Sequence, residues 1–204
     1  MHLGLIPDGN RRYGDKVYGS SLEGYQDSSA AFQMVVNWCL HTSVDHLSVF
    51  VFSTENFARE EKSELFAYLE TAFVDMRQDK RLAVEILSCG GYRERFPESL
   101  RAQMDRVERE SSKKPSLRLH LLMGYGGNCE IQDALKYGTL LTAHLPPLDM
   151  VLRTGNVSRL SNFLPYQSAY AELFFLKCLF PEITEKVLNE SLQAFNKTAR
   201  RFGT

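Results

Sequence analysis

The chain has 204 residues and a formal net charge of −1, from 24 basic and 25 acidic side chains. This length suits one compact domain, and a content of 44% apolar and 24% charged residues excludes intrinsic disorder as the main state. The near-neutral charge excludes a protein that holds nucleic acid by bulk positive charge. No apolar run reaches the length of a membrane span and the N-terminus lacks a charged signal region, so we expect a cytoplasmic protein without a transmembrane segment. The four cysteines lie far apart in the sequence, which favours reduced thiols over a disulfide or zinc framework.

Short apolar runs alternate with longer stretches of helical pattern along the chain. The runs are continuously apolar, as in 46–52, which is typical of parallel strands covered on both faces. This alternation predicts a single α/β domain over residues 1–204, with a mostly parallel six-stranded sheet flanked by helices. The expected strands are 2–6, 46–52, 83–88, 117–123, 149–153 and 172–176, and the expected helices are 28–41, 60–79, 97–111, 128–143 and 185–201.

The loops that follow the strands are the candidate sites, because ligands of open α/β sheets bind at the carboxyl ends of the strands. The loop after the first strand contains Asp8, Gly9 and two arginines, a set that suits a phosphate group and a hard cation such as Mg²⁺. Taken alone, the same residues fit a helix cap followed by two solvated arginines. The loop after the second strand adds Ser53, Asn56 and Arg59, which fit either helix caps or polar ligands.

Two later loops extend this set. The glycine-rich turn at 124–128 matches neither the dinucleotide fingerprint nor the P-loop, so nucleotide binding is disfavoured and a simple tight turn is an equal alternative. The loop after the fifth strand carries Arg153, Arg159 and Ser161, which either converge on one diphosphate or form a polar surface. Glu172 enters an apolar strand and must be paired, metal-bound or exposed. We expect the loops to bring the arginines, the hydroxyl residues and both carboxylates, Asp8 and Glu172, to one edge of the sheet, which suggests two diphosphates and one divalent metal there. Helix aromatics behind this edge form the wall of a hydrocarbon pocket or, for any one of them, ordinary core.

Several linked motifs resemble those of the cis-prenyltransferases, the undecaprenyl diphosphate synthase-like family. They span nearly the whole chain and occur in the order that the family shows. The motifs are PDGNRR at 7–12, FSTENF at 52–57 with Arg59, YGG at 125–127 with Glu130 and Ile131, RTG at 153–155, RLSNFL at 159–164, Gln167, and YAE at 170–172.

The resemblance implies Mg²⁺-dependent transfer of a prenyl group between two isoprenoid diphosphates. By the family pattern, Asp8 positions Mg²⁺ and assists departure of the allylic diphosphate, and Glu172 reaches the metal site of a partner subunit, which implies a homodimer. The other implied residues are Gly9, Asn10, Arg11 and Arg12 for the allylic diphosphate; Arg153, Arg159 and Ser161 for the second diphosphate; and Ser53, Asn56, Phe57 and Arg59 for the loop that closes over the reacting pair, with Asn56 and Arg59 as its catalytic members.

Departures from the family pattern refine this expectation. Ser21 and Tyr25 stand where the family usually has an Arg and a His, Asn128 replaces a usual Arg, and the stretch from 128 to 149 is short. These features are similar to those of the head-to-middle, lavandulyl-type subgroup, which joins two allylic diphosphates.

We therefore expect a short-chain synthase that joins dimethylallyl or geranyl diphosphate to a second C5 diphosphate. Head-to-middle condensation with dimethylallyl diphosphate is favoured over regular head-to-tail cis transfer to isopentenyl diphosphate. A non-catalytic partner subunit is the alternative of another class, although the intact 8–12 loop disfavours it. A phosphate-binding hydrolase or phosphatase finds no support, because neither a G-x-S-x-G elbow nor an HExxH motif is present.

Overall fold

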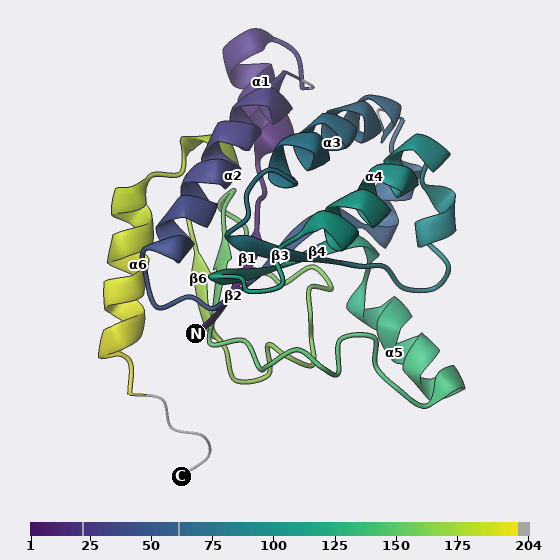
Figure 1. Ribbon diagram of the computed structural model, residues 1–204. Coiled ribbons are helices and arrows are strands. Elements are labelled where there is room, and N and C mark those ends of the chain that lie inside the picture. The colour runs from purple at the N-terminus through teal and green to yellow at the C-terminus, as the bar shows by residue number, and fades with distance from the viewer. Residues whose placement is uncertain (22, 61, 200–204) are drawn as a thin grey trace.

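A computed structural model describes residues 1–21, 23–60 and 62–199, which build one sheet of parallel strands (Figure 1). Along the sheet the strand order is β3-β4-β2-β1-β5-β6, and every neighbouring pair is parallel. The carboxyl ends of all six strands therefore meet at one edge, as the sequence predicts. The strands are β1 (His2–Ile6), β2 (His46–Ser53), β3 (Leu82–Leu87), β4 (Leu117–Tyr125), β5 (Met150–Arg153) and β6 (Glu172–Phe175).

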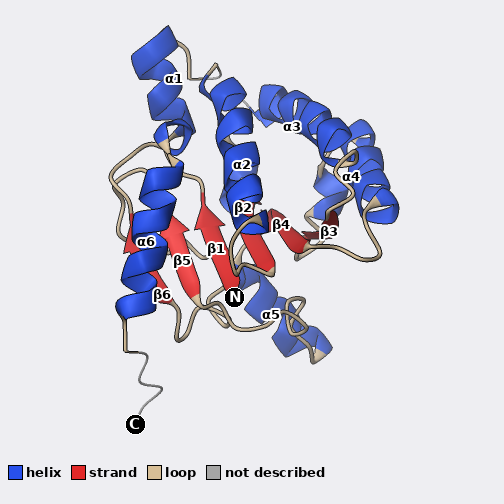
Figure 2. Cartoon of the chain, turned by 60° about the vertical axis from the view of Figure 1, so that its left-hand side comes forward, coloured by secondary structure: helices blue, strands red, loops and turns tan. Residues whose placement is uncertain are grey.

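The helices cover both faces of this sheet (Figure 2). One hydrophobic cluster joins the sheet to α2, α3, α4 and α6, and a second cluster joins its other face to α5 and to the loops around Leu145 and Phe163. The helices are α1 (Asn10–Tyr18), α2 (Gly24–Leu40), α3 (Lys62–Met76), α4 (Glu98–Glu110), α5 (Gly127–Tyr137) and α6 (Glu185–Lys197).

The differences from the expected helices have local causes. The separate helix α1 has nine residues, and most of them are polar, so it lacks an apolar period long enough to mark it in the sequence. Helix α5 ends six residues before the predicted 143, because Gly138 takes φ 84° and caps it in the left-handed conformation. The predicted helices 60–79 and 185–201 include residues 61, 200 and 201, which lie outside the described residues.

Within residues 1–21, 23–60 and 62–199, no helix combines the length and the apolar character that crossing a bilayer requires.

Candidate active site

A cavity of about 970 Å³ opens at the carboxyl edge of the sheet. Its lining comes mainly from the segments that follow β1, β2 and β5, as expected for ligand sites of open α/β sheets. Five arginines face three carboxylates here, although the chain as a whole is nearly neutral, so positive charge is concentrated at this edge. The charged lining residues are Arg11, Arg12, Arg59, Arg153 and Arg159, with Asp8, Asp15 and Glu55.

Asp8 lies at the centre of the charged cluster. Its Oδ2 accepts a hydrogen bond of 2.8 Å from Nη2 of Arg153, and its Oδ1 lies 3.3 Å from Nη2 of Arg12. The pairing of Ile6 with Arg153 in neighbouring strands brings these two loops together. Gly155 permits the close approach, because a Cβ at this position would lie 2.5 Å from Nη2 of Arg12.

The Arg153 side chain is 5% exposed and organises the loop after β5. Its Nη1 donates to the carbonyl oxygen of Arg159 at 2.5 Å and to the hydroxyl of Ser161 at 2.6 Å. This loop holds non-glycine residues with positive φ, including Ser161 at 51° and Leu164 at 37°, and such strain is typical of ligand-binding segments. Within the described structure, Nε of Arg153 is buried without a hydrogen-bond partner.

The segment after β1 leads into an uncapped helix start at the cavity. Helix α1 begins at Asn10 after Gly9, whose φ of 113° is left-handed, and no side chain caps its first turn. The open N–H groups and the positive end of the helix dipole suit a phosphate group. Asn10 itself is held by Ser28, whose hydroxyl donates to its Oδ1 at 2.8 Å.

The segment after β2 forms a short 3₁₀ helix, Thr54–Ala58, beside the cavity. The Asn56 side chain accepts a 3.0 Å hydrogen bond from the backbone N–H of Ser53, which fixes the start of this turn. Ser53, Asn56 and Arg59 all line the cavity, so the structure brings the three residues together with Asp8.

Two expected residues lie elsewhere. Phe57 does not line this cavity: it is 7% exposed, and its ring centroid lies 4.8 Å from that of Phe52 and 4.9 Å from that of Phe96. The structure thus places Phe57 in the core, and its contact with substrate stays a prediction. Glu172 opens β6 opposite Met150, at the amino end of the strands, whereas Asp8 follows the carboxyl end of β1. The expectation that both carboxylates lie at one edge of the sheet is therefore wrong within a single chain. The role of Glu172 toward a partner subunit stays a prediction.

Several lining residues were not named as site residues from the sequence. Tyr25 and Asn128 line the cavity, and their departure from the family pattern was the only signal in the sequence that marked them. Glu55 and Asn162 also line the cavity, and the sequence marks them only as members of the FSTENF and RLSNFL motifs. Burial raises the pKa of Glu55, but hydrogen bonds from its own backbone and from neighbouring side chains outweigh burial and hold the pKa below its usual value.

The fit of Mg²⁺ to this site depends on the Asp8 carboxylate. Its side chain is 32% exposed to the cavity, and Mg²⁺ is commonly bound by one or two carboxylates together with substrate phosphates. Among residues 1–21, 23–60 and 62–199, no group of three or more His, Cys, Asp or Glu side chains forms a cage for a metal. The residues present therefore fit an Mg²⁺ ion held by Asp8 together with diphosphate oxygens.

Comparisons with known proteins agree with this architecture. Residues 6–203 match the family model described as "Putative undecaprenyl diphosphate synthase". A tritrans,polycis-undecaprenyl-diphosphate synthase (geranylgeranyl-diphosphate specific) from Picrophilus torridus is 34% identical over 99% of this chain and 89% of its own length. A di-trans,poly-cis-undecaprenyl-diphosphate synthase from Giardia intestinalis is 32% identical over 100% and 89%.

Two solved structures share the fold over 100% of this chain and 98% of theirs. A lavandulyl diphosphate synthase from Lavandula x intermedia, in complex with dimethylallyl diphosphate, has a TM-score of 0.89 at 22% identity. A probable undecaprenyl diphosphate synthase from Campylobacter jejuni has a TM-score of 0.81 at 26% identity. The arginine-rich edge of the parallel sheet and these matches lead to one conclusion: the chain is a prenyltransferase of the undecaprenyl diphosphate synthase family, the cis-prenyltransferases.

Proposed function

We propose that the chain is a short-chain prenyl diphosphate synthase that joins dimethylallyl or geranyl diphosphate to a second C5 diphosphate. The observation that supports the proposal most strongly is that Arg12 and Arg153 both form ion pairs with Asp8 inside one cationic cavity. Arg12 comes from the segment after β1, which presents an uncapped helix start, and Arg153 ends β5 beside the Ser161 loop. These are two neighbouring anion sites, as the joining of two diphosphates requires.

The reaction follows from the placement of these groups. Arg11, Arg12 and the first turn of α1 hold the allylic diphosphate, and their positive charge stabilises it as its C–O bond breaks. Arg153, Arg159 and Ser161 hold the second diphosphate, whose double bond attacks the allylic carbon. A proton then leaves to the departing diphosphate. A bound Mg²⁺ supplies further stabilisation of the leaving-group charge, with Asp8 as the residue that would hold it.

Head-to-middle condensation with dimethylallyl diphosphate is the favoured regiochemistry. Its support is the replacement of the usual His by Tyr25, which lines the cavity, and of the usual Arg by Asn128. The names of the curated relatives favour the alternative, regular cis transfer to isopentenyl diphosphate. Mass-spectrometric product analysis with dimethylallyl diphosphate alone, and with isopentenyl diphosphate added, separates the two. A branched C10 product from dimethylallyl diphosphate alone supports the first, and a linear Z-product that needs isopentenyl diphosphate overturns it.

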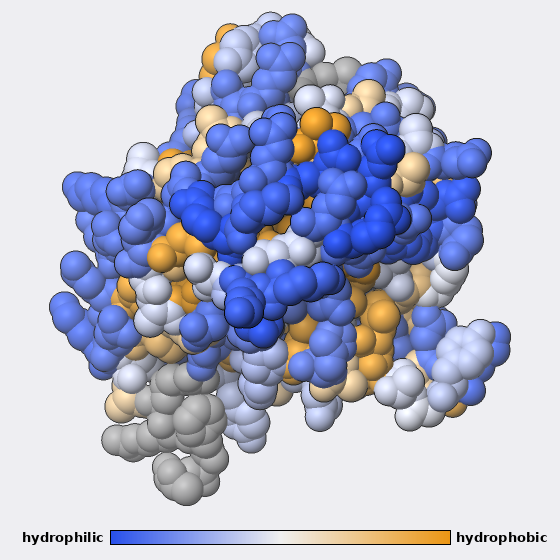
Figure 3. Space-filling view, viewed as in Figure 1, coloured by the Kyte–Doolittle hydropathy of each residue, from blue (hydrophilic) through white to orange (hydrophobic). Residues whose placement is uncertain are grey.

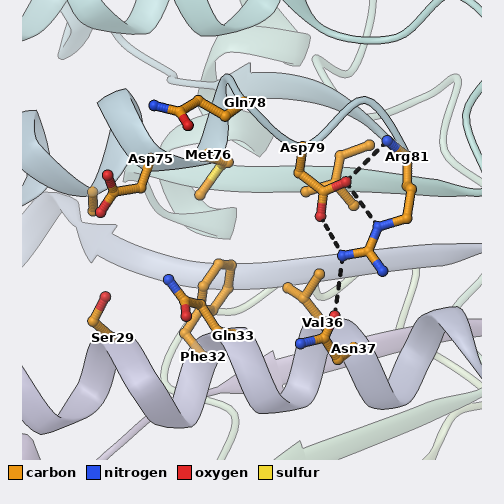
Figure 4. Close-up of a pocket in the computed structure, with 12 residues that line it drawn as sticks. Ser29, Phe32, Gln33, Val36, Asn37, Asp75, Met76, Gln78, Asp79 and Arg81 are labelled. Atoms are coloured by element: carbon orange, nitrogen blue, oxygen red, sulfur yellow. Dashed lines mark hydrogen bonds and ion pairs between the residues drawn. The ribbon is translucent and has the colours of Figure 1, made fainter.

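The groove between α2 and α3 favours a short product. Tyr25 and Leu65 line the large cavity, while Ser29 and Ala72, about one to two helical turns further along, line a separate cavity of about 300 Å³ (Figure 4). Tyr68 lies between them, with its ring centroid 6.1 Å from that of Tyr25. We infer that this pair of rings ends the hydrocarbon pocket, so the second cavity is closed to the product.

A homodimer is part of the same proposal. Large apolar side chains are exposed on α5 and around β6, and Figure 3 shows hydrophobic surface in the region of α5. Leu135 is 84% exposed, and a helix side this apolar is rarely left in water. Light scattering of the purified chain checks the dimer, with Leu135→Glu as the variant expected to dissociate it; a monomer at micromolar concentration for the unaltered chain contradicts it. The exposed residues are Ile131, Leu135, Tyr137, Leu141, Tyr166, Tyr170 and Leu173.

The other class of function, a non-catalytic partner subunit, is less well supported. Asp8, Asn10, Arg11 and Arg12 are present and line the cavity together. Turnover by the purified chain without any other protein rejects this alternative, and strict dependence on a second, different chain supports it.

A further inference from the structure

Two cysteines that are 40 residues apart in the sequence lie against each other beneath the active-site edge. Cys89 follows β3 by two residues and is 4% exposed, and Cys129 is the third residue of α5 and half-buried. Both belong to the hydrophobic cluster on the α5 face of the sheet, where the Cys129 thiol is near enough to Cys89 to raise its pKa. The Cys89 thiol itself donates to the carbonyl oxygen of Gly126 at 3.6 Å. Cys39 and Cys178 pack in the cluster on the opposite face.

The backbone around the two sulfur atoms is held at close range. Gly90, next to Cys89, donates its N–H to Oδ2 of Asp133 at 2.6 Å. Cys129 and Asp133 are four residues apart, so they face the same segment from one side of α5. A Cβ at Gly90 would lie 2.4 Å from Sγ of Cys129, which places this sulfur directly over the turn. The glycine is thus required by the sulfur contact as well as by its φ of 58°.

We propose that Cys89 and Cys129 are a dithiol site that forms a reversible intramolecular disulfide with a small-molecule disulfide oxidant such as oxidised glutathione. The half-buried Cys129 attacks the oxidant as a thiolate, which forms a mixed disulfide and releases one small thiol. The Cys89 thiolate then attacks the Cys129 sulfur and releases the second small thiol. Two protein thiols and one small disulfide become one protein disulfide and two small thiols, so two electrons pass to the oxidant and both protons end on the released thiols.

Burial controls the rate of the second step. Burial and the contact with Cys129 raise the pKa of the Cys89 thiol, so little Cys89 thiolate exists at neutral pH. The disulfide therefore forms slowly at neutral pH and faster as the pH rises.

The disulfide would also affect the binding of anions in the cavity. Asn128, adjacent to Cys129, lines the cavity and donates its N–H to Oδ1 of Asn162 at 2.8 Å, and Gly127 donates to the carbonyl oxygen of Asn162 at 2.8 Å. An S–S bond is about 2 Å long, shorter than a contact between two thiols, so it draws the start of α5 toward Cys89. We expect this movement to weaken the Asn162 contacts and lower the affinity for a diphosphate. This last step rests on the proposed function, whereas formation of the disulfide does not.

The test uses the whole purified chain under native conditions with oxidised glutathione and then with dithiothreitol. Peptide mapping is expected to find a Cys89–Cys129 crosslink with the loss of two hydrogen atoms, prevented by Cys129→Ser and not by Cys178→Ser, a half-buried control on the other face. Isothermal titration with inorganic diphosphate is expected to show a several-fold weaker affinity after oxidation, restored by dithiothreitol.

Each of the other outcomes contradicts a specific part of the proposal. Absence of the crosslink, or crosslinks through Cys39 or Cys178 instead, overturns the dithiol site, and mapping by alkylation of the unaltered chain decides this even if a variant fails to fold. A crosslink with unchanged diphosphate affinity overturns the coupling to the cavity. Failure of the reduced chain to bind diphosphate contradicts the anion site and leaves the crosslink result standing.

Discussion

At the scale of single residues, Arg153 explains why the charged cluster is ordered. Its buried guanidinium contacts Asp8, the carbonyl oxygen of Arg159 and the hydroxyl of Ser161, so it positions groups from two loops at once. The resemblance predicts that Arg153 mainly binds the second diphosphate. Since it also holds Asp8, its replacement by Ala is now expected to impair both diphosphate sites.

Replacing Asp8 tests the role of its charge. In Asp8→Asn the side chain keeps its size, but the negative charge between Arg12 and Arg153 is lost. We expect kcat to fall by about 100-fold or more, as when one preorganised stabilising group is removed. Asp15→Asn, which also removes a carboxylate from the cavity lining, is the matched control and should retain most activity. Equal activity of Asp8→Asn and the unaltered chain contradicts the role.

Tyr68 offers a residue-scale test of product length. Tyr68→Ala removes the ring that lies between the two cavities, so chain-length analysis is expected to find products at least one isoprene unit longer. Tyr68→Phe keeps the ring and loses only the hydroxyl group, and its products should be unchanged. If Ala and Phe variants give the same product lengths, the ring is not the end of the pocket.

At the scale of elements, the start of α5 is tied to the loops by a buried carboxylate. Glu130 is 1% exposed and accepts hydrogen bonds from the Tyr125 hydroxyl and, at 2.7 Å, from both the N–H and the hydroxyl of Thr142. Gln167 donates in turn to the Thr142 side chain at 2.7 Å. The glycine turn, the 138–148 segment and the Ser161 loop are thereby held together.

We expect Glu130→Gln to lower the free energy of unfolding by about 1–3 kcal/mol, because the amide replaces an acceptor-only group and leaves donors badly placed. Urea unfolding measures this change. Gln132→Ala, on the exposed side of the same helix, is the control and should stay within about 0.5 kcal/mol of the unaltered chain. A change no larger than that of the control would show that the buried network does not stabilise the fold.

The sequence predicts the positions of the strands better than it predicts contacts between side chains. Continuous apolar runs located all six strands, because parallel strands buried on both faces have this composition. The sequence predicts neither the polar helix α1 nor the burial of the Phe57 side chain in the core, because neither produces a periodic pattern or a charge pattern in the sequence. The wide sequence spacing of Cys89 and Cys129 predicts isolated thiols, and only the packing of α5 on the sheet brings them together.

At the scale of the whole molecule, a buried histidine makes stability depend on pH. His2 is 2% exposed; its Nδ1–H donates to the carbonyl oxygen of Pro146 and its Nε2 accepts from the Ser48 hydroxyl, both at 2.8 Å. Burial is the main cause that lowers the pKa of His2 from 6.5 to about 4. The unfolded chain therefore binds this proton below about pH 6.5 and the folded chain only below about pH 4, so stability decreases as the pH falls through this window.

We expect the free energy of unfolding to fall by about 2 kcal/mol from pH 7.5 to pH 5 on account of His2. Burial also lowers the pKa of His46, which adds a change in the same direction. Urea unfolding across this range measures the slope, which His2→Gln should reduce and His41→Gln, at an exposed position, should not. A slope that His2→Gln leaves unaltered contradicts this assignment.

If the cationic cavity holds two diphosphates and joins their prenyl groups, turnover must form a new carbon–carbon bond. The most direct measurement gives the purified chain dimethylallyl diphosphate and Mg²⁺ and quantifies inorganic diphosphate together with the organic products. We predict one inorganic diphosphate released for each C10 diphosphate formed. Release of inorganic diphosphate with free C5 alcohol and no new carbon–carbon bond, both here and with isopentenyl diphosphate added, would contradict the account.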